Sequence, residues 1–298
     1  MIQAWSQRWS QTITRLLNQP RYQLILRLTL VIVALQGIDE LHAERLPEKG
    51  LAVVMLFSAK LLQSRYAWCG LAALMVWNNV YFWWRLVNHE YLITYWVLVC
   101  AIAAFSQFSL KIFAWNARLL IGLCFLFATA WKFMGGEYLD GSFLHLTFLV
   151  DPRLAMGATW LGGVAADLLQ DNYDQLLTIQ AATSPESALI NSSPLMSALS
   201  VALSYWTIFI EGIVAIAFLS PWPRWLFLHR DEWLLIFVVS TYSVIPVFSF
   251  AAILLLMGLA QCALTQRFKA ALYLNLLLLI PLWLPLPQEI FYFLQQWS

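Results

Sequence analysis

The sequence predicts an all-α protein, a polytopic transmembrane bundle of about eight or nine helical segments. Of its 298 residues, 61% are hydrophobic and only 11% are charged, whereas a soluble domain carries roughly 25% charged residues. Several apolar runs approach the roughly 20 residues that cross a bilayer. The 16 Trp and 11 Tyr residues suit aromatic belts at membrane interfaces. Lipid is therefore the expected solvent and partner, and the net charge of +1 gives no sign of nucleic acid.

The chain is expected to form a single membrane domain with four parts. Residues 1–20 place apolar positions at helical spacing between arginines and polar residues, which predicts a cytoplasmic interfacial helix and not a signal peptide. Residues 21–134 hold transmembrane segments one to five, 135–195 an exoplasmic amphipathic connection, and 196–298 segments six to eight or nine. The predicted segments are 22–38, 50–64, 66–85, 91–109, 115–133, 197–219, 232–262 and 269–294.

The orientation follows from the distribution of Lys and Arg in the loops, because cytoplasmic loops are enriched in both. Basic residues gather before the first segment and after the sixth, whereas the 135–195 connection contains Arg153 as its only basic residue. The N-terminus is therefore expected in the cytoplasm and the connection outside. A bacterial inner membrane is the expected location, with a thylakoid-type membrane as the alternative.

The apolar stretch 232–262 breaks this alternation, because basic residues flank it on both sides. Pro246 lies near its middle, and proline removes a helical hydrogen bond. If 232–262 forms two short helices that enter and leave the membrane on the same side, the basic residues at both ends lie in the cytoplasm, as the rule requires. A single long, tilted and kinked span is the alternative.

Three ionisable residues at membrane depth are candidates for chemistry, because such groups are costly in lipid. They are Lys132 at the end of the fifth segment, His89 before the fourth, and Glu211 within the sixth. A desolvated lysine is a competent general base for a phenol-like proton, and the topology puts Lys132 and His89 at similar depth. In the structural alternatives, Lys132 extends to the headgroups, and His89 is a hydrogen-bonded loop residue. Asn88 then caps the next helix, and Glu211 has a buried polar role, structural or catalytic.

Cysteine and metal chemistry are not expected. Cys69, Cys100, Cys124 and Cys262 lie within apolar segments, and none belongs to a CxxC motif or a Cys/His cluster. Packed thiols and no bound metal are the prediction.

Three short motifs resemble a known family. NHEYL (Asn88–Leu92), AWKFMGGEYLDGS (Ala130–Ser142) and VFSFAAILLL (Val247–Leu256) resemble elements of the membrane domain of vitamin K-dependent gamma-carboxylase, in the same order. The second motif has one extra residue between its lysine and its glycine. Together they suggest the wider horizontally transferred transmembrane (HTTM) superfamily, over residues 20–265.

The resemblance implies a reduced quinone of the vitamin K type as cofactor. Lys132 would match the base that deprotonates the hydroquinone, and His89 a residue that positions or polarises the quinone oxygens. Oxygenation of the deprotonated quinol gives an epoxide and a strong base, which removes a glutamate γ-proton before CO2 adds. The other expected quinone-binding residues are Asn88, Tyr91, Tyr138, Glu211 and Tyr242.

Two departures separate this chain from the carboxylase itself. No segment resembles the large lumenal domain that helps to hold the protein substrate. VVSTYSVIPVF (residues 238–248) has Thr241 and Tyr242 where many members of the superfamily carry a histidine. The expected activity is therefore a quinol-dependent oxygenase or epoxidase, or a relative that modifies a peptide or protein. The alternative is a non-enzymatic membrane subunit or assembly factor of a larger complex with a decayed site. A transporter would predict inverted repeats, which the sequence does not show.

Overall fold

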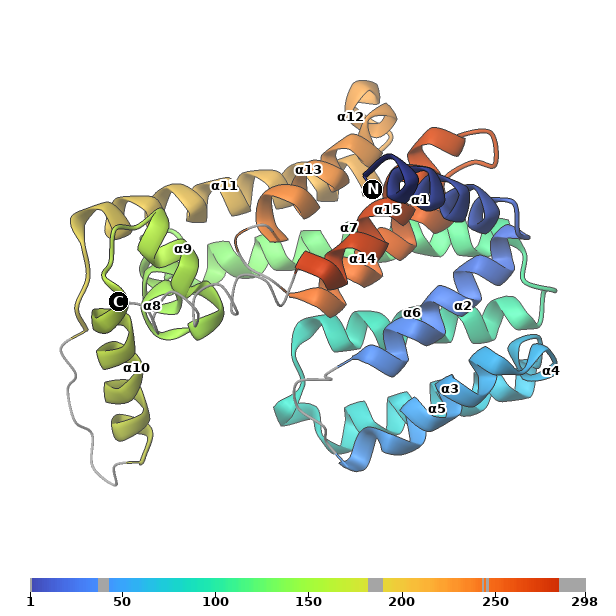
Figure 1. Cartoon of the computed structure of the whole chain (residues 1–298), viewed down its shortest axis with the longest axis horizontal. Helices are drawn as coiled ribbons and strands as arrows, with labels where there is room; N and C mark the ends of the chain where they lie inside the picture. The colour runs from blue at the N-terminus through green and yellow to red at the C-terminus, as the bar shows by residue number, and fades with distance from the viewer. Residues whose placement is uncertain (1, 37–42, 182–189, 243, 245–246, 284–298) are drawn as a thin grey trace. The chain divides into compact units, whose positions relative to one another are not determined.

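Every regular element that the structure describes is a helix, which confirms the all-α class (Figure 1). The structure is a computed structural model, and it describes residues 2–36, 43–181, 190–242, 244 and 247–283. The α-helices are α1 (Ile2–Leu17), α2 (Arg21–Leu35), α3 (Leu46–Phe57), α4 (Ala59–Leu62), α5 (Arg65–Tyr81), α6 (Asn88–Ala104), α7 (Leu110–Gly135), α8 (Ser142–Val150), α9 (Ala155–Trp160), α10 (Ala166–Ala181), α11 (Pro194–Leu219), α12 (Arg224–Leu228), α13 (Arg230–Tyr242), α14 (Phe248–Gln261) and α15 (Arg267–Trp283). Short 3-10 turns cover Ala43–Arg45, Trp83–Arg85 and Pro152–Leu154.

Among the described residues, two helices are long and apolar enough to cross a membrane. Helices α7 and α11 each have 26 residues, about 39 Å at 1.5 Å per residue, and the hydrocarbon core of a bilayer is about 30 Å thick. Only 28% of the apolar window of α7 and 44% of that of α11 is buried inside the protein. Most of each window therefore faces outward, which favours membrane association. The bundle of about eight or nine membrane-spanning segments expected from the sequence stays a prediction.

Most of the other predicted segments form shorter helices, and a serine divides one of them. The predicted segment 50–64 is divided between α3 and α4 at Ser58, whose backbone is extended and whose Oγ accepts a hydrogen bond from Leu61 N at 3.3 Å. Ser64 caps α5 in the same way through Ala67 N, at 3.4 Å. Serine oxygen atoms satisfy the free N–H groups of a helix start, so each serine begins a new helix.

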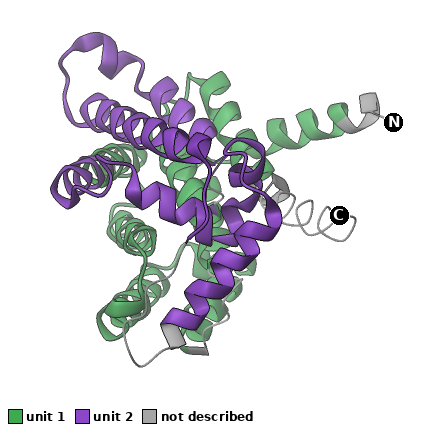
Figure 2. Ribbon diagram, turned by 90° about the vertical axis from the view of Figure 1, so that its left-hand side faces the viewer, with its two compact units in different colours: residues 1–124, 248–280 green, residues 125–247, 281–298 purple. Residues whose placement is uncertain are grey.

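The predicted segment 232–262 forms two helices instead of one continuous helix. Helix α13 ends at Tyr242, Val244 lies in a turn, and α14 begins at Phe248. The expected break at Pro246 falls between them, but this residue lies outside the described part of the chain. The two halves also belong to different compact units, residues 1–124 with 248–280 and residues 125–247 with 281–298 (Figure 2).

Helix α14 is the centre of the first unit. All its residues from Ala251 to Gln261 are buried, and a helix that is apolar on all sides belongs inside a bundle. It packs against α2 and α6, while α2 also contacts α3 and α5 contacts α6. Gly258 allows a close approach to α15, because a Cβ atom there would lie 2.3 Å from the ring of Tyr273.

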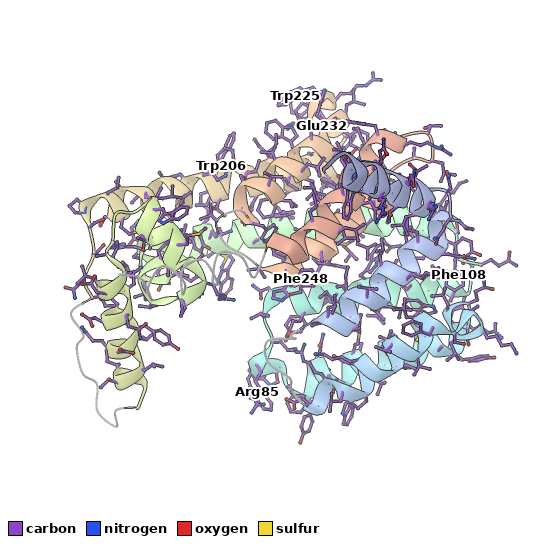
Figure 3. The ribbon with its side chains drawn as sticks, in the orientation of Figure 1. Arg85, Phe108, Trp206, Trp225, Glu232 and Phe248 are labelled. Atoms are coloured by element: carbon purple, nitrogen blue, oxygen red, sulfur yellow. The ribbon has the colours of Figure 1, made fainter. Side chains whose placement is uncertain are left out.

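Helix α11 organises the second unit, with α8 and α13 packed against it. The connection predicted at 135–195 contains α8, α9 and α10, and α10 extends to Ala181. These helices share a small apolar core with the start of α11, formed by Leu144, Phe148, Leu149, Leu154, Ala155, Ala158, Val164, Leu169 and Met196. Trp206 on α11 and Trp225 on α12 project outward from this unit (Figure 3).

Candidate functional site

Lys132 and Glu211 form a buried ion pair in the second unit. Lys132 lies in the last turn of α7, and its Nζ donates a hydrogen bond to Oε2 of Glu211 on α11. The two residues are only 8% and 6% exposed. Thr129 and Gly212 bring the two helices together beside the pair, because a Cβ at Gly212 would lie 3.8 Å from Thr129 Cγ2. The pair therefore joins the two helices that are long enough to span a membrane.

The loop after α7 places an aromatic ring over the amine. Lys132 Nζ lies 4.9 Å from the centre of the Tyr138 ring, which is the geometry of a cation–π contact. Gly136 and Gly141 have φ values of +70° and +80°, a backbone region that glycine enters without steric cost. They let the chain turn from α7 into α8. The Tyr138 ring also stacks on Phe143, with centroids 4.7 Å apart.

Burial changes the proton affinity of the Tyr138 phenol. Loss of hydration, and secondly the negative charge of Glu211, raise the pKa of Tyr138 to about 12. Both causes oppose formation of the phenolate. Tyr138 is therefore a neutral hydrogen-bonding group beside the pair over the physiological pH range.

The apolar neighbours of Lys132 face outward while Lys132 faces inward. Trp131, Phe133 and Met134 are 73%, 56% and 80% exposed. A soluble protein would place these side chains the other way round, whereas lipid accepts them. Lys132 thus does not extend outward to headgroups, the structural alternative that its place at a helix end suggested.

The buried pair can accept a proton in two ways. In its ionic form the Glu211 carboxylate has free lone pairs that accept from an O–H group. Transfer of the shared proton from Lys132 to Glu211 leaves a neutral amine, which is then the acceptor. The sequence suggested Lys132 alone as the base. The structure pairs Lys132 with Glu211, so a proton acceptor at this place would be a two-residue unit.

The residues predicted around His89 lie in the first unit, at the start of α6. The His89 ring is half-buried and stacks on Phe250 of α14, with centroids 6.2 Å apart. This contact joins the NHEYL and VFSF motifs. Tyr91 donates a hydrogen bond from its hydroxyl to Trp83 O at 3.4 Å. The expected similar depth of His89 and Lys132 in the membrane stays a prediction.

Asn88 does not cap α6, contrary to the structural alternative. It is the first helical residue and is exposed, while Val87 is the N-cap. The side chain of Glu90 accepts from Val87 N at 3.3 Å. A carboxylate at the third helical position takes over the cap in this way.

Sequence reasoning missed a second buried ion pair, between Arg45 and Glu90. The guanidinium donates two hydrogen bonds to the carboxylate, at 2.6 and 2.8 Å, and both residues are buried. Such two-point pairs fix geometry as well as charge. Glu90 lies inside the NHEYL motif, and a carboxylate within an apolar chain was the signal that could have found it.

Tyr242 belongs to the aromatic packing of the second unit. It is the last residue of α13, is buried, and meets Phe237 edge-on at 5.8 Å. Phe237 in turn contacts Phe125 of α7 at 4.6 Å. The structure thus joins Lys132, Tyr138 and Glu211 directly, and places Tyr242 among aromatic rings of the same unit.

The candidate site offers a cation, an aromatic ring and a carboxylate to a ligand. These groups suit a flat molecule that carries oxygen atoms, because binding sites combine apolar walls with a few placed polar groups. Among the described residues, no group of three or more His, Cys, Asp or Glu side chains is placed to hold a metal ion. Comparisons with models of protein families, with curated proteins and with solved structures give no match for this chain.

Proposed function

We propose that this chain is a multi-pass membrane protein of the HTTM type that deprotonates a reduced quinone of the vitamin K class. The observation that carries the proposal is the buried Lys132–Glu211 pair with the Tyr138 ring over the amine. The motif resemblance supports it independently, because it assigns the base of quinol chemistry to Lys132. A bacterial inner membrane is the proposed location.

The role of the chain is proton transfer and the exclusion of water. The Lys132–Glu211 pair would accept the hydroxyl proton of the quinol, and the Tyr138 phenol, which stays neutral, would donate a hydrogen bond to a ligand oxygen. The quinol supplies two electrons and two protons, so that with O2 it gives an epoxide and water. The resemblance also assigns quinone binding to His89, Asn88 and Tyr91, and that assignment stays a prediction. The proposal also includes coupling to a peptide or protein substrate, but formation of the epoxide does not require this coupling.

The test is epoxide formation by the purified protein in detergent. Wild-type protein is incubated with reduced vitamin K and O2, and the epoxide is detected by mass spectrometry. Lys132→Ala should abolish the product. Lys132→Arg is the matched variant, because arginine preserves the ion pair but does not become a neutral base. Lys111→Ala, at an exposed residue of α7, controls for loss of a lysine elsewhere.

The variants separate catalysis from a structural role. Product that is lost in both Lys132 variants, with folded protein and an active Lys111→Ala control, supports the proton-transfer role. Full activity in Lys132→Arg would exclude Lys132 as the acceptor, because arginine cannot accept the proton, and would leave the Glu211 carboxylate as the acceptor within the pair. Folded wild-type protein that forms no epoxide would favour the alternative, a membrane subunit or assembly factor in which the pair only joins α7 to α11.

A further inference from the structure

A groove of about 430 Å³ is lined by residues of α1 and α15 in the first unit. The hydroxyl and amide groups of Ser10, Thr14 and Asn18, with the guanidinium of Arg267, supply its polar lining. Ile13 and Phe268 supply apolar surface. Trp9 and Asn275 join the two helices, because Trp9 Nε1 donates to Asn275 Oδ1 at 2.6 Å.

Arg21, the first residue of α2, is only 8% exposed, and no described atom accepts a hydrogen bond from its Nη1. Cys262 and Arg267 both lie near enough to act on it electrostatically, and Arg267, which lines the groove, repels it. A buried charge without a partner costs several kcal/mol, so two neighbouring guanidinium groups call for an anion.

The local backbone adds to the positive potential. Helix α2 begins at Arg21 after Pro20, without a side-chain cap, and α15 begins at Arg267. The first N–H groups of a helix carry partial positive charge and bind phosphate groups. Two helix starts and two arginines therefore occupy the same end of the unit.

We propose that this end of the first unit binds the phosphate group of an anionic phospholipid, held by Arg267 and Arg21, with its acyl chains along the apolar side of the groove. A lipid fits better than free phosphate, because Ile13 is buried in the groove wall and Phe268 is 76% exposed at its edge. Basic pockets between membrane helices on the cytoplasmic side bind such headgroups. The inference rests on the membrane location in the proposed function, but it does not depend on quinol chemistry.

The experiment is native mass spectrometry of the full chain, released from detergent after incubation with phosphatidylglycerol or phosphatidylcholine. One bound phosphatidylglycerol should be retained, in preference to phosphatidylcholine. Arg267→Gln and Arg21→Gln should each weaken its binding about tenfold, the usual loss for a charge-assisted hydrogen bond. Arg15→Gln is the matched control, because Arg15 is exposed on α1 and does not line the groove.

The outcomes decide between a site, a diffuse charge effect and free phosphate. Phosphatidylglycerol binding that is retained by Arg15→Gln and lost in the other two variants supports the site. Equal weakening in all three variants would mean diffuse attraction and would overturn it, as would inorganic phosphate that displaces the lipid at comparable concentration. Arg267 is exposed, so its variant tests the proposal even if Arg21→Gln fails to fold. The assay contains no quinone, so its failure is distinct from an absence of epoxide.

Discussion

Lys132 and Glu211 depend on each other for the stability of their charges. Both are buried, so removal of one leaves the other charged and without a partner. We expect Lys132→Met or Glu211→Met alone to lower the free energy of unfolding by about 3–5 kcal/mol, whereas the double variant should recover most of that loss. Thermal unfolding of the four proteins in detergent measures the coupling. Additive losses in the double variant would show that the pair does not form.

Tyr138 makes stability depend on pH in the alkaline range. Burial raises its pKa to about 12 in the folded protein, whereas an unfolded tyrosine titrates near 10. Between these values the unfolded chain releases the phenolic proton and the folded protein does not, so stability falls as the pH rises. Its contribution is complete below about pH 10.

Tyr138→Phe should remove this part of the pH dependence and keep the ring over Lys132. The measurement is the melting temperature of both proteins at several alkaline pH values, together with the difference in their tyrosinate absorbance. A difference spectrum that titrates near the ordinary tyrosine value would contradict the burial of Tyr138.

At the level of residues, the sequence identified the charged side chains but not their partners. Lys132 and Glu211 stood out because charges are rare in this chain, but they lie 79 positions apart. Only tertiary contact could pair them. In the structural alternative to quinone binding, Asn88 caps α6, since asparagine favours that position. Glu90 satisfies the cap from inside the helix instead, and its bond to Arg45 fixes it there.

At the level of elements, the close approach of α14 and α15 depends on Gly258. A Cβ atom there would lie 2.3 Å from Tyr273 Cε1, so Gly258→Ala should destabilise the protein by about 1–3 kcal/mol through overpacking. Gly70→Ala is the matched control, because Gly70 lies inside α5 with open space around its Cα. Alanine there should stabilise the helix by up to about 1 kcal/mol. An equal decrease in the melting temperature of both variants would contradict the packing argument.

Element boundaries were harder to predict than helical class. Apolar composition gave the existence of the helices, but hydrophobicity continues through Ser58, and the helical backbone does not. The Ser58 cap divides the predicted span 50–64 into two short helices, whereas the Ser64 cap lies at the predicted boundary between two spans. The connection after α7 shows the opposite effect. The sequence predicted an amphipathic connection there, and the inward faces of α8, α9 and α10 form a small core, which a composition count does not show because it averages the polar and apolar faces of a helix.

At the scale of the whole molecule, charge placement predicts which parts lie on each side of the membrane. The 135–195 connection holds Arg153 as its single basic residue, whereas arginines recur before α2 and after α11. Because Lys and Arg are retained in the cytoplasm, a cysteine at Asp171, exposed on α10, should react with an impermeant maleimide in intact bacterial cells. A cysteine at Gln11, exposed on α1, should react only after permeabilisation.

The native cysteines provide the background for this measurement. Cys100 and Cys262 are buried, and Cys69 and Cys124 are half-buried, so labelling of the unsubstituted chain gives the value to subtract. Reaction at position 11 with protection at position 171 would invert the topology and move the Arg21–Arg267 end to the outer leaflet. Labelling of both positions in intact cells would show that they do not lie on opposite sides of the membrane. In that case the outward-facing apolar windows of α7 and α11 would have to be covered by another protein instead of by lipid.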